Sequence, residues 1–215
     1  MSDPGYHEIR LPHDPHKAAL WAVLVRHGLQ RFISEGARVL DLGCGHGYFI
    51  NAVQARERHA LDAEPAMKAF LDPAVLFHAG DVRDLSGFAD GSLDAVFASN
   101  LLEHLDHDDA ARLLGSVRRI LAPGGRLILL QPNFKYCASS YFDDYTHRTA
   151  WSHVSLADRL RASGFEVERL IPRWLPFRGS PLPASPLSPL LARIYLMLPW
   201  RPFAAQMLAV AQPRP

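Results

Sequence analysis

Residues 39–49 read VLDLGCGHGYF. The β-rich run at 38–42 predicts a short β-strand, and the residues from Tyr48 onward predict a helix. Three glycines stand between them, because the backbone there must turn sharply and approach a ligand with no Cβ in the way. The unpaired N–H groups at the start of the helix can hold a negative or polar group. The stretch therefore predicts the first strand–turn–helix unit of a ligand-binding α/β fold.

The spacing of these glycines favours an amine-bearing ligand over a dinucleotide. They form the pattern Gly43-x-Gly45-x-Gly47, in which the third glycine comes one residue earlier than in the dinucleotide pattern G-x-G-x-x-G. Asp41 stands just before the loop. A carboxylate at that place suits a cationic or amine-bearing ligand better than it suits a pyrophosphate. For the glycines taken alone, a purely structural turn is the alternative.

Two further acids follow the next two predicted strands. Asp62 stands 19 positions after Gly43, at the end of a predicted strand over 59–62, and its carboxylate can accept both hydroxyls of a ribose. Asp81 follows a predicted strand over 75–78 and can accept a hydrogen bond from an adenine amino group while Val82 packs on the ring. Each acid has an ordinary turn residue as its alternative. Three acids at the ends of three successive strands are more specific than any one of them.

The rest of the chain alternates in the same way. Periodicity predicts helices over 16–34, 48–56, 108–121 and 153–163, and further strands over 93–98, 126–130, 165–171 and 207–211. Asp106 and Ser152 are the expected N-caps of the last two helices. Strands that are apolar on both faces indicate a mainly parallel sheet covered by helices. The prediction is a Rossmann-like, doubly wound α/β fold with seven strands. It forms one domain over 1–215, divided into an N-terminal helical cap (1–36), a core (37–171), a proline-rich apolar insertion (172–204) and a last strand with its tail (205–215).

Bulk composition narrows the class of protein. The chain has 215 residues, 48% of them hydrophobic, which is enough for one well-buried domain. A net charge of +1 gives no electrostatic case for binding nucleic acid. Two cysteines fit a reducing compartment. The first residues lack a signal-peptide pattern, and no stretch reaches the roughly 20 apolar residues that span a bilayer. We therefore expect a cytoplasmic enzyme or binding protein with no transmembrane segment.

Five segments resemble the class I S-adenosylmethionine-dependent methyltransferases. They are VLDLGCGHGYF, HALDAEPAM, AGDVRDL, LDAVFASNLLEHL and ILAPGGRLIL, which follow the order and spacing of that family between residues 37 and 171. The resemblance implies S-adenosylmethionine as cofactor and S-adenosylhomocysteine as product. Carried over residue by residue, it implies a cofactor site made of Asp41, Gly43, Cys44, Gly45, Gly47, Asp62, Ala63, Asp81, Val82, Asn100 and Leu101.

A looser resemblance covers residues 131–177. This stretch is similar to bacterial methyltransferases associated with the synthesis of glycans and glycolipids, which often carry an aspartate and a histidine after the fifth strand. The resemblance implies a small-molecule, glycan or lipid-linked acceptor, methylated at oxygen. Methylation of nitrogen or carbon on an apolar, quinone-like ring is the alternative, and Trp151, Trp174, Phe177 and Trp200 can supply an apolar pocket for it. A second alternative is a non-catalytic module that binds S-adenosylmethionine and regulates a partner.

Candidate catalytic residues follow the fourth and fifth predicted strands. His147 is the first candidate for a general base because imidazole titrates near neutrality, and Asp144, three residues before it, can orient the ring. His104 competes for this role, with simple packing as its alternative. The segment around His147 can also be a polar loop that closes over the cofactor. Eleven histidines raise the question of a metal, but no pair stands in a recognised ligand pattern, so no metal site is predicted.

One apolar segment has no place in the core pattern. Residues 187–198 carry a single charge, at Arg193, and are too short to cross a bilayer. They can pack over the sheet edge, mediate a homodimer or lie at a bilayer surface as a peripheral contact.

Overall fold

The computed structural model describes residues 13–176 and 188–214, which form two compact units. The described part of unit 1 comprises residues 13–82 and 188–199, and that of unit 2 comprises residues 83–176 and 200–214. Parts of the predicted cap (1–12) and of the predicted insertion (177–187, including Phe177) therefore lie outside the described residues. Within unit 1 the strand order is β3-β2-β1, and within unit 2 it is β4-β5-β7-β6.

Unit 1 carries three parallel strands, β1 (Arg38–Leu42), β2 (Glu57–Asp62) and β3 (Val75–Ala79). Their register pairs Leu42 with Leu61 and Asp62 with Ala79. The carboxyl ends of all three strands are therefore level, and the loops that follow them leave from one edge. The predicted strands over 38–42, 59–62 and 75–78 are confirmed.

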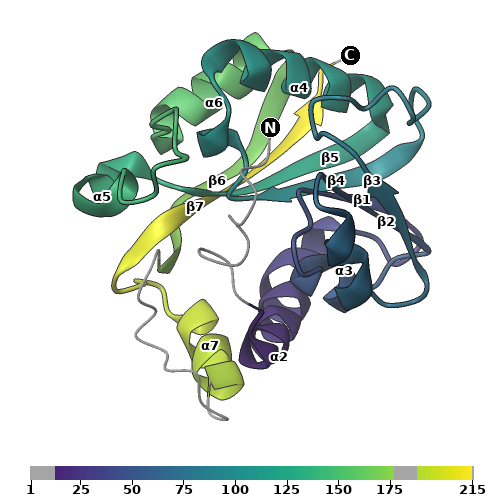
Figure 1. Ribbon diagram of the computed structural model, residues 1–215. Coiled ribbons are helices and arrows are strands. Elements are labelled where there is room, and N and C mark those ends of the chain that lie inside the picture. The colour runs from purple at the N-terminus through teal and green to yellow at the C-terminus, as the bar shows by residue number, and fades with distance from the viewer. Residues whose placement is uncertain (1–12, 177–187, 215) are drawn as a thin grey trace. The chain divides into compact units, whose positions relative to one another are not determined.

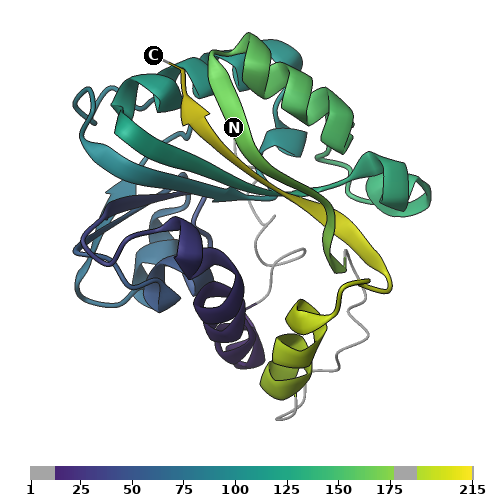
Figure 2. The same ribbon diagram turned by 180° about the vertical axis from the view of Figure 1, so that it is seen from behind.

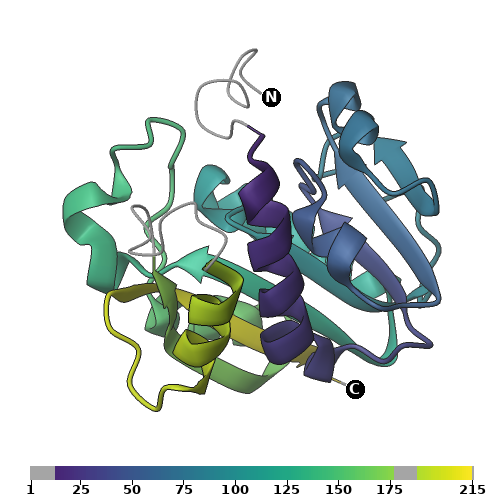
Figure 3. The ribbon, with the colours of Figure 1, turned by 90° about the horizontal axis from the view of Figure 1, so that it is seen from below.

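The helices of unit 1 pack on these strands and on one another. Helix α3 contacts β1 and β2, and α2 contacts both α3 and α7, so that α2 and α7 lie side by side (Figures 1 and 3). Asp14 caps α2 by accepting a hydrogen bond from the His16 N–H at 2.9 Å. The elements are α2 (Pro15–Leu24), the π-helix η1 (Val25–Leu29), the 3₁₀ helices η2 (Gln30–Phe32) and η3 (Pro65–Phe70), α3 (Tyr48–Ala52) and α7 (Ser188–Met197).

Two predicted helices differ from the structure in extent or type. The predicted helix over 16–34 is confirmed, but only its first part is α-helical. The predicted helix over 48–56 ends at Ala52, where Val53 turns to extended backbone. The reason is a competing partner. The Gln30 amide donates to the Gln54 carbonyl at 2.9 Å and accepts from the Gln54 N–H at 2.9 Å, which removes those backbone groups from a continuing helix.

Unit 2 carries four strands of mixed direction. Strand β4 (Leu93–Ser99) pairs in parallel with β5 (Leu121–Pro132), whereas β7 (Ala204–Pro213) runs antiparallel to both β5 and β6 (Phe165–Pro176). The predicted strands over 93–98, 126–130, 165–171 and 207–211 are confirmed within these longer bounds. The seven-stranded α/β fold class is thus confirmed, with β7 as the strand that makes the sheet mixed.

The two long helices of unit 2 lie on the same face of these strands (Figures 1 and 2). Asp106 caps α4 (His107–Ile120) by accepting from the Asp109 N–H at 2.8 Å, as predicted. Ser152 and Ser155 form a capping box at the start of α6 (His153–Ala162), and Gly164 follows its end at φ +84°. The remaining elements of the unit are η4 (Leu102–His104) and α5 (Phe134–Tyr141). No helix among the described residues is long and apolar enough to span a membrane.

Candidate functional site

The glycine loop of unit 1 is held to the end of β2. Gly43, Gly45 and Gly47 have φ values of +68°, +49° and +69°, a region that strongly favours glycine. One carboxylate oxygen of Asp62 accepts from the Gly45 N–H at 2.9 Å, and the other accepts from the Glu64 N–H at 3.0 Å. Among the described residues, apart from its two chain neighbours, a Cβ built on Gly45 would meet no atom within 4 Å. The loop is therefore fixed by Asp62, and none of these described residues fills the space beside Gly45.

Two carboxylates at this loop make the site acidic. Asp41 and Asp62 are both buried. Burial, and then the neighbouring Asp62 carboxylate, raise the pKa of Asp41 well above its usual range. A cation bound nearby would relieve this unfavourable charge. The donor set therefore fits S-adenosylmethionine, which carries a sulfonium and an ammonium group, and fits a dinucleotide pyrophosphate poorly.

The other predicted cofactor residues of unit 1 extend the same edge. Cys44 is buried, and its N–H, like that of Gly43, donates to the Leu61 carbonyl. Ala63 is exposed directly after β2. Asp81 and Val82 are half-buried and follow β3, where the Gly80 N–H donates to the Asp62 carbonyl at 2.9 Å.

A cluster of rings, which the sequence analysis missed, lies against the glycine loop. The ring centroid of His46 is 4.5 Å from that of Phe70, and the His13 ring stacks on Phe70 at 4.8 Å. The Tyr48 hydroxyl donates to the Asp14 carbonyl at 3.1 Å and accepts from the Asp14 N–H at 2.9 Å. Residues 13 and 14 are thereby held beside the loop. The signal in the sequence was the presence of two rings, at 46 and 48, around the third glycine.

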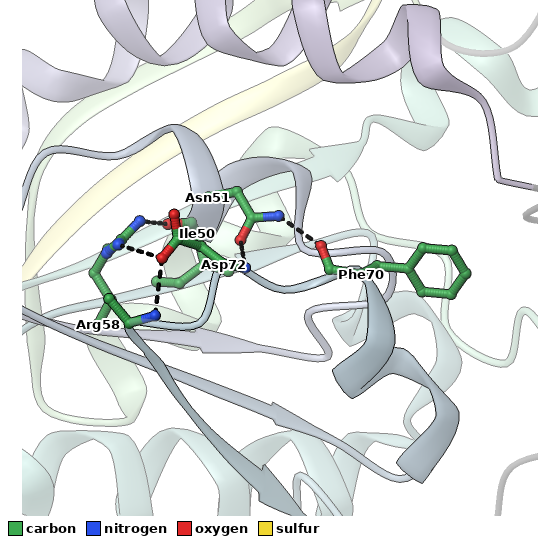
Figure 4. Close-up of polar contacts among 6 residues, drawn as sticks. Ile50, Asn51, Arg58, Phe70 and Asp72 are labelled. Carbon is green, nitrogen blue, oxygen red and sulfur yellow. Dashed lines mark hydrogen bonds and ion pairs between the residues drawn. The ribbon is translucent and has the colours of Figure 1, made fainter.

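A polar network positions Phe70 for this contact (Figure 4). The Asn51 side chain donates to the Phe70 carbonyl at 2.8 Å and accepts from the Asp72 N–H at 2.9 Å. Arg58 donates to the Ile50 carbonyl and to the Asp72 carboxylate, each at 3.3 Å. The network ties α3, β2 and the segment after η3 together behind the glycine loop.

We expect Gly47→Ala to lower the free energy of unfolding by about 2–5 kcal/mol. A left-handed φ costs a residue with a Cβ about 1–2 kcal/mol, and overpacking adds about 1–3 kcal/mol. The new Cβ would lie 2.2 Å from Leu71 Cδ2 and 3.3 Å from Asn51 Nδ2. Urea unfolding measures the loss. Gly45→Ala is the control, because Gly45 has a similar φ but no described neighbour within 4 Å of the new Cβ. This variant should lose only the contribution of the left-handed φ. Equal losses in the two variants would contradict the steric explanation.

Asn100 and Leu101, the predicted cofactor residues of unit 2, follow β4. Asn100 adopts φ +49°, and its N–H donates to the Leu130 carbonyl at 2.8 Å. Its side-chain oxygen accepts from Gln206 at 2.8 Å. Leu101 is half-buried before η4. Non-glycine residues with positive φ are uncommon and cluster at functional sites, so this strand end is a strained position of the kind that ligands exploit.

The predicted catalytic residues come together in unit 2. We call Glu103, His104, Asp144, Thr146 and His147 the Glu–His cluster. The ring centroids of His104 and His147 are 5.0 Å apart, although 43 positions separate the two residues.

Backbone hydrogen bonds hold the two parts of the Glu–His cluster together. The Glu103 carbonyl accepts from the N–H groups of Arg148 and Thr149, at 2.7 and 3.1 Å. The Thr149 hydroxyl donates to the Leu105 carbonyl at 2.7 Å, and the Trp151 indole N–H donates to the Leu102 carbonyl at 3.1 Å. The loop after α5 is thus fixed to η4.

A hydrogen-bonded chain runs through the Glu–His cluster. The Thr146 hydroxyl donates to an Asp144 carboxylate oxygen at 2.6 Å, and it lies 2.9 Å from His104 Nδ1. Since the hydroxyl proton goes to Asp144, His104 Nδ1 is the donor to Thr146. These bonds link the predicted carboxylate to His104 through a threonine that the sequence analysis did not single out. His147 lies beside both His104 and Tyr141, whose ring centroid is 4.7 Å from that of His147.

Two buried polar side chains were also missed. Glu103 is 0% exposed, and neither of its carboxylate oxygens has a hydrogen-bond partner among the described residues. Burial raises the pKa of Glu103 to about 8, whereas burial and then the nearby His147 lower the pKa of His104 to about 4. Gln131, near the end of β5, is equally buried, and its amide atoms likewise lack a described partner. Polar groups of this kind usually mark a functional site or a bound species.

Known proteins match this chain in sequence and in fold. Residues 16–170 match the family described as methyltransferase domain. The chain is 30% identical over 168 residues to an uncharacterized 37.1 kDa protein of a Streptomyces fradiae transposon, covering 67% of this chain and 48% of that protein. It is 30% identical over 129 residues to a ubiquinone biosynthesis O-methyltransferase of Xylella fastidiosa, covering 55% and 52%. The chain thus spans about half the length of the curated relatives it matches.

Two solved structures agree in fold over nearly the whole chain. An S-adenosylmethionine-dependent methyltransferase from Archaeoglobus fulgidus has a TM-score of 0.68 at 18% identity, covering 96% of each chain. One from Mesorhizobium loti has a TM-score of 0.62 at 20% identity, covering 90% of this chain and 97% of the other. These likenesses support the fold, and the family match covers the glycine loop, the strand-end acids and the Glu–His cluster. The chain therefore belongs to the methyltransferase domain family.

Proposed function

We propose that this protein transfers a methyl group from S-adenosylmethionine to an oxygen atom of a small-molecule, glycan or lipid-linked acceptor. The observation that carries the proposal is the Glu–His cluster, in which two buried carboxyl groups lie with two half-buried imidazoles, and in which hydrogen bonds join Asp144, Thr146 and His104. Titratable groups arranged in this way can activate a hydroxyl. A relative named as an O-methyltransferase of ubiquinone biosynthesis supports both oxygen as the methylated atom and a small-molecule acceptor.

The cofactor residues proposed for this reaction are those at the strand ends. The Asp62 carboxylate would accept the ribose hydroxyls, Asp81 would accept from the adenine amino group, and the acidic charge of Asp41 would favour the cationic donor. When bound, S-adenosylmethionine supplies a methyl group that is already activated by a positive sulfur. The chain's own residues then mainly have to align the acceptor, which lowers a barrier by about 7–11 kcal/mol at best.

A hydroxyl acceptor also needs to lose its proton. We propose His147 as the general base, with Asp144 as a positioning residue and His104 as the competing imidazole. A base positioned in this way contributes about 10²–10⁴ in rate. The chain from Asp144 through Thr146 to His104 supports an ordered cluster, because each link restrains the next side chain.

Helix α7 supports an apolar or lipid-linked acceptor. Ala192 and Tyr195 are buried in this helix, which contacts α2, whereas Leu190, Ile194 and Met197 are exposed. The predicted packing role and the predicted surface role of residues 187–198 are therefore compatible, on opposite faces of one helix. Contact with a bilayer surface, or with a second copy of the chain, is the proposal for the exposed face.

An aromatic pocket for a quinone-like ring has less support. Trp151 and Trp174 are almost completely buried, and Trp200 is exposed. The Trp151 indole N–H is bonded to the Leu102 carbonyl. Two of the three tryptophans expected to line such a pocket are thus part of the core, which favours oxygen over ring carbon as the methylated atom.

We expect His147→Ala and Asp144→Ala to lower turnover by about 10²–10⁴, the contribution of a positioned base. Turnover is measured as S-adenosylhomocysteine formed with a panel of sugars, phenols and lipid-linked acceptors. Affinity for S-adenosylhomocysteine, measured by calorimetry, should stay within about twofold of the parent. His27→Ala, at an exposed histidine of the π-helix η1, is the control. Unchanged turnover in both variants would remove these residues from the mechanism, and failure of the parent protein to bind S-adenosylhomocysteine would remove the proposal itself.

A further inference from the structure

We propose that Glu103, His104 and His147 bind a divalent transition-metal ion of the Zn²⁺ type. Each of the three offers one ligand atom, and these atoms all lie within 4.8 Å of one another. The residues come from η4 and from the loop fixed to it, so the backbone hydrogen bonds described above hold the ligand set together. The sequence analysis expected no metal, because Glu103 and His104 are adjacent and His147 follows 43 positions later, a spacing that matches no ligand motif.

Glu103 is the strongest indication of a bound cation. Its side chain is completely buried, yet neither oxygen accepts a hydrogen bond from any described residue. Burying a carboxyl group without a partner is unfavourable, and such groups are normally paired or coordinate a metal. A cation placed between Glu103 and the two imidazoles would satisfy the carboxylate and make its burial favourable.

His104 already has the tautomer that a metal ligand needs. Its Nδ1 donates to the Thr146 hydroxyl, which in turn donates to Asp144, and this places the lone pair on Nε2. Histidines that bind metals typically donate their other ring nitrogen to an oxygen acceptor, which orients the ring. Here Thr146 and Asp144 provide that support. They are positioning residues and not ligands.

The ligand types favour zinc over magnesium or calcium. Two imidazoles and one carboxylate are the donor set of catalytic zinc sites, which leave a fourth position open, whereas Mg²⁺ and Ca²⁺ prefer oxygen ligands. Metal–ligand bonds of about 2.0–2.2 Å place tetrahedral ligand atoms about 3.4 Å apart. The observed limit of 4.8 Å requires only that the side chains draw together slightly.

A metal here would change the role proposed for His147. As a ligand, His147 would hold the cation, and the cation would lower the pKa of a bound hydroxyl in place of a base. The inference goes beyond the proposed function, and metal binding is measurable without any acceptor. Its failure would leave His147 as the proposed base.

A group of histidines in unit 1 serves as a control. His59 lies between His78 and Glu57, with its two ring nitrogens 3.0 Å and 2.7 Å from them. Both nitrogens of His59 are therefore engaged within that group, which makes it a poorer ligand set. This group can still compete with the Glu–His cluster for an added metal ion. The variant His59→Ala tests whether the added metal binds there.

The experiment is a titration of the chelator-treated 215-residue protein with Zn²⁺ and with Co²⁺. Metal content after dialysis gives the stoichiometry, and visible absorption of the Co²⁺ form reports tetrahedral coordination. We expect one equivalent per chain, a rise in melting temperature with Zn²⁺, and weakening of binding by at least about 100-fold in Glu103→Gln and His147→Ala. Thr146→Val should weaken binding by about 10–100-fold, the usual effect of losing support for a ligand.

Matched substitutions separate this site from non-specific binding. Glu166→Gln and His27→Ala change exposed residues of the same types and should leave the tight equivalent intact. Glu103→Gln keeps the shape of the side chain, and S-adenosylhomocysteine binding verifies that each variant is folded. The proposal is overturned if Glu103→Gln and His147→Ala bind zinc as the parent does, if His59→Ala removes the tight equivalent, or if the parent shows no tight equivalent.

Discussion

Asp62→Ala is expected to weaken binding of S-adenosylhomocysteine by about 10²- to 10³-fold. A hydrogen bond to a charged group is worth about 1.5–3 kcal/mol, and each 1.4 kcal/mol is tenfold in affinity. The substitution removes the proposed acceptor of two ribose hydroxyls. It also removes the bonds from Asp62 to the N–H groups of Gly45 and Glu64, so the glycine loop loses its anchor on β2. Calorimetric titration measures the affinity.

Two further variants separate ligand contact from loop anchoring. Asp62→Asn keeps the size of the side chain and an oxygen for one N–H, so we expect an intermediate loss. Glu35→Ala removes an exposed acid of the same unit and should bind as the parent does. An Asp62→Ala affinity within threefold of the parent would show that the ribose does not depend on this residue.

Trp151→Ala is expected to lower the free energy of unfolding by about 3–5 kcal/mol, the usual cost of truncating a buried aromatic residue. Trp151 is 2% exposed, and its ring lies edge-on to that of His107 at 5.1 Å. The indole N–H holds the Leu102 carbonyl, and the Trp151 carbonyl accepts from the Phe134 N–H at 2.9 Å. The residue thus joins η4, α4 and α5 behind the Glu–His cluster. Urea unfolding measures the change.

The comparison variants identify what Trp151 contributes. Trp151→Phe keeps most of the apolar volume and removes one of the two donors to the Leu102 carbonyl, which keeps the Leu105 N–H at 3.2 Å, so we expect a loss of about 0.5–1.5 kcal/mol. Trp200→Ala removes an exposed tryptophan and should change stability by less than about 0.5 kcal/mol. A Trp151→Ala loss no larger than that of Trp200→Ala would contradict the packing described here.

Local patterns in the sequence were sufficient for most of the fold. The apolar run ending at Gly43, the acids at 41 and 62, and the N-caps Asp106 and Ser152 all act within a few residues, and the structure confirms the strands and helices predicted from them. Local signals could not show that β7 runs antiparallel, because strand direction depends on pairing with β5 and β6. Nor could they show that α3 ends at Ala52, because Gln30, from a distant helical segment, takes the backbone groups of Gln54.

The sequence by itself determined the family, the glycine loop and the acids expected to hold the cofactor, because these residues follow one another along the chain in a recognisable order. Only the tertiary structure decided which side chains meet His104. Thr146 and His147 reach it because backbone bonds fix the loop after α5 to η4, and Glu103 lies beside them without a described hydrogen-bond partner because folding buried it there. The spacing of these residues in the sequence does not predict that they lie side by side, since this depends on contacts between segments about 40 positions apart.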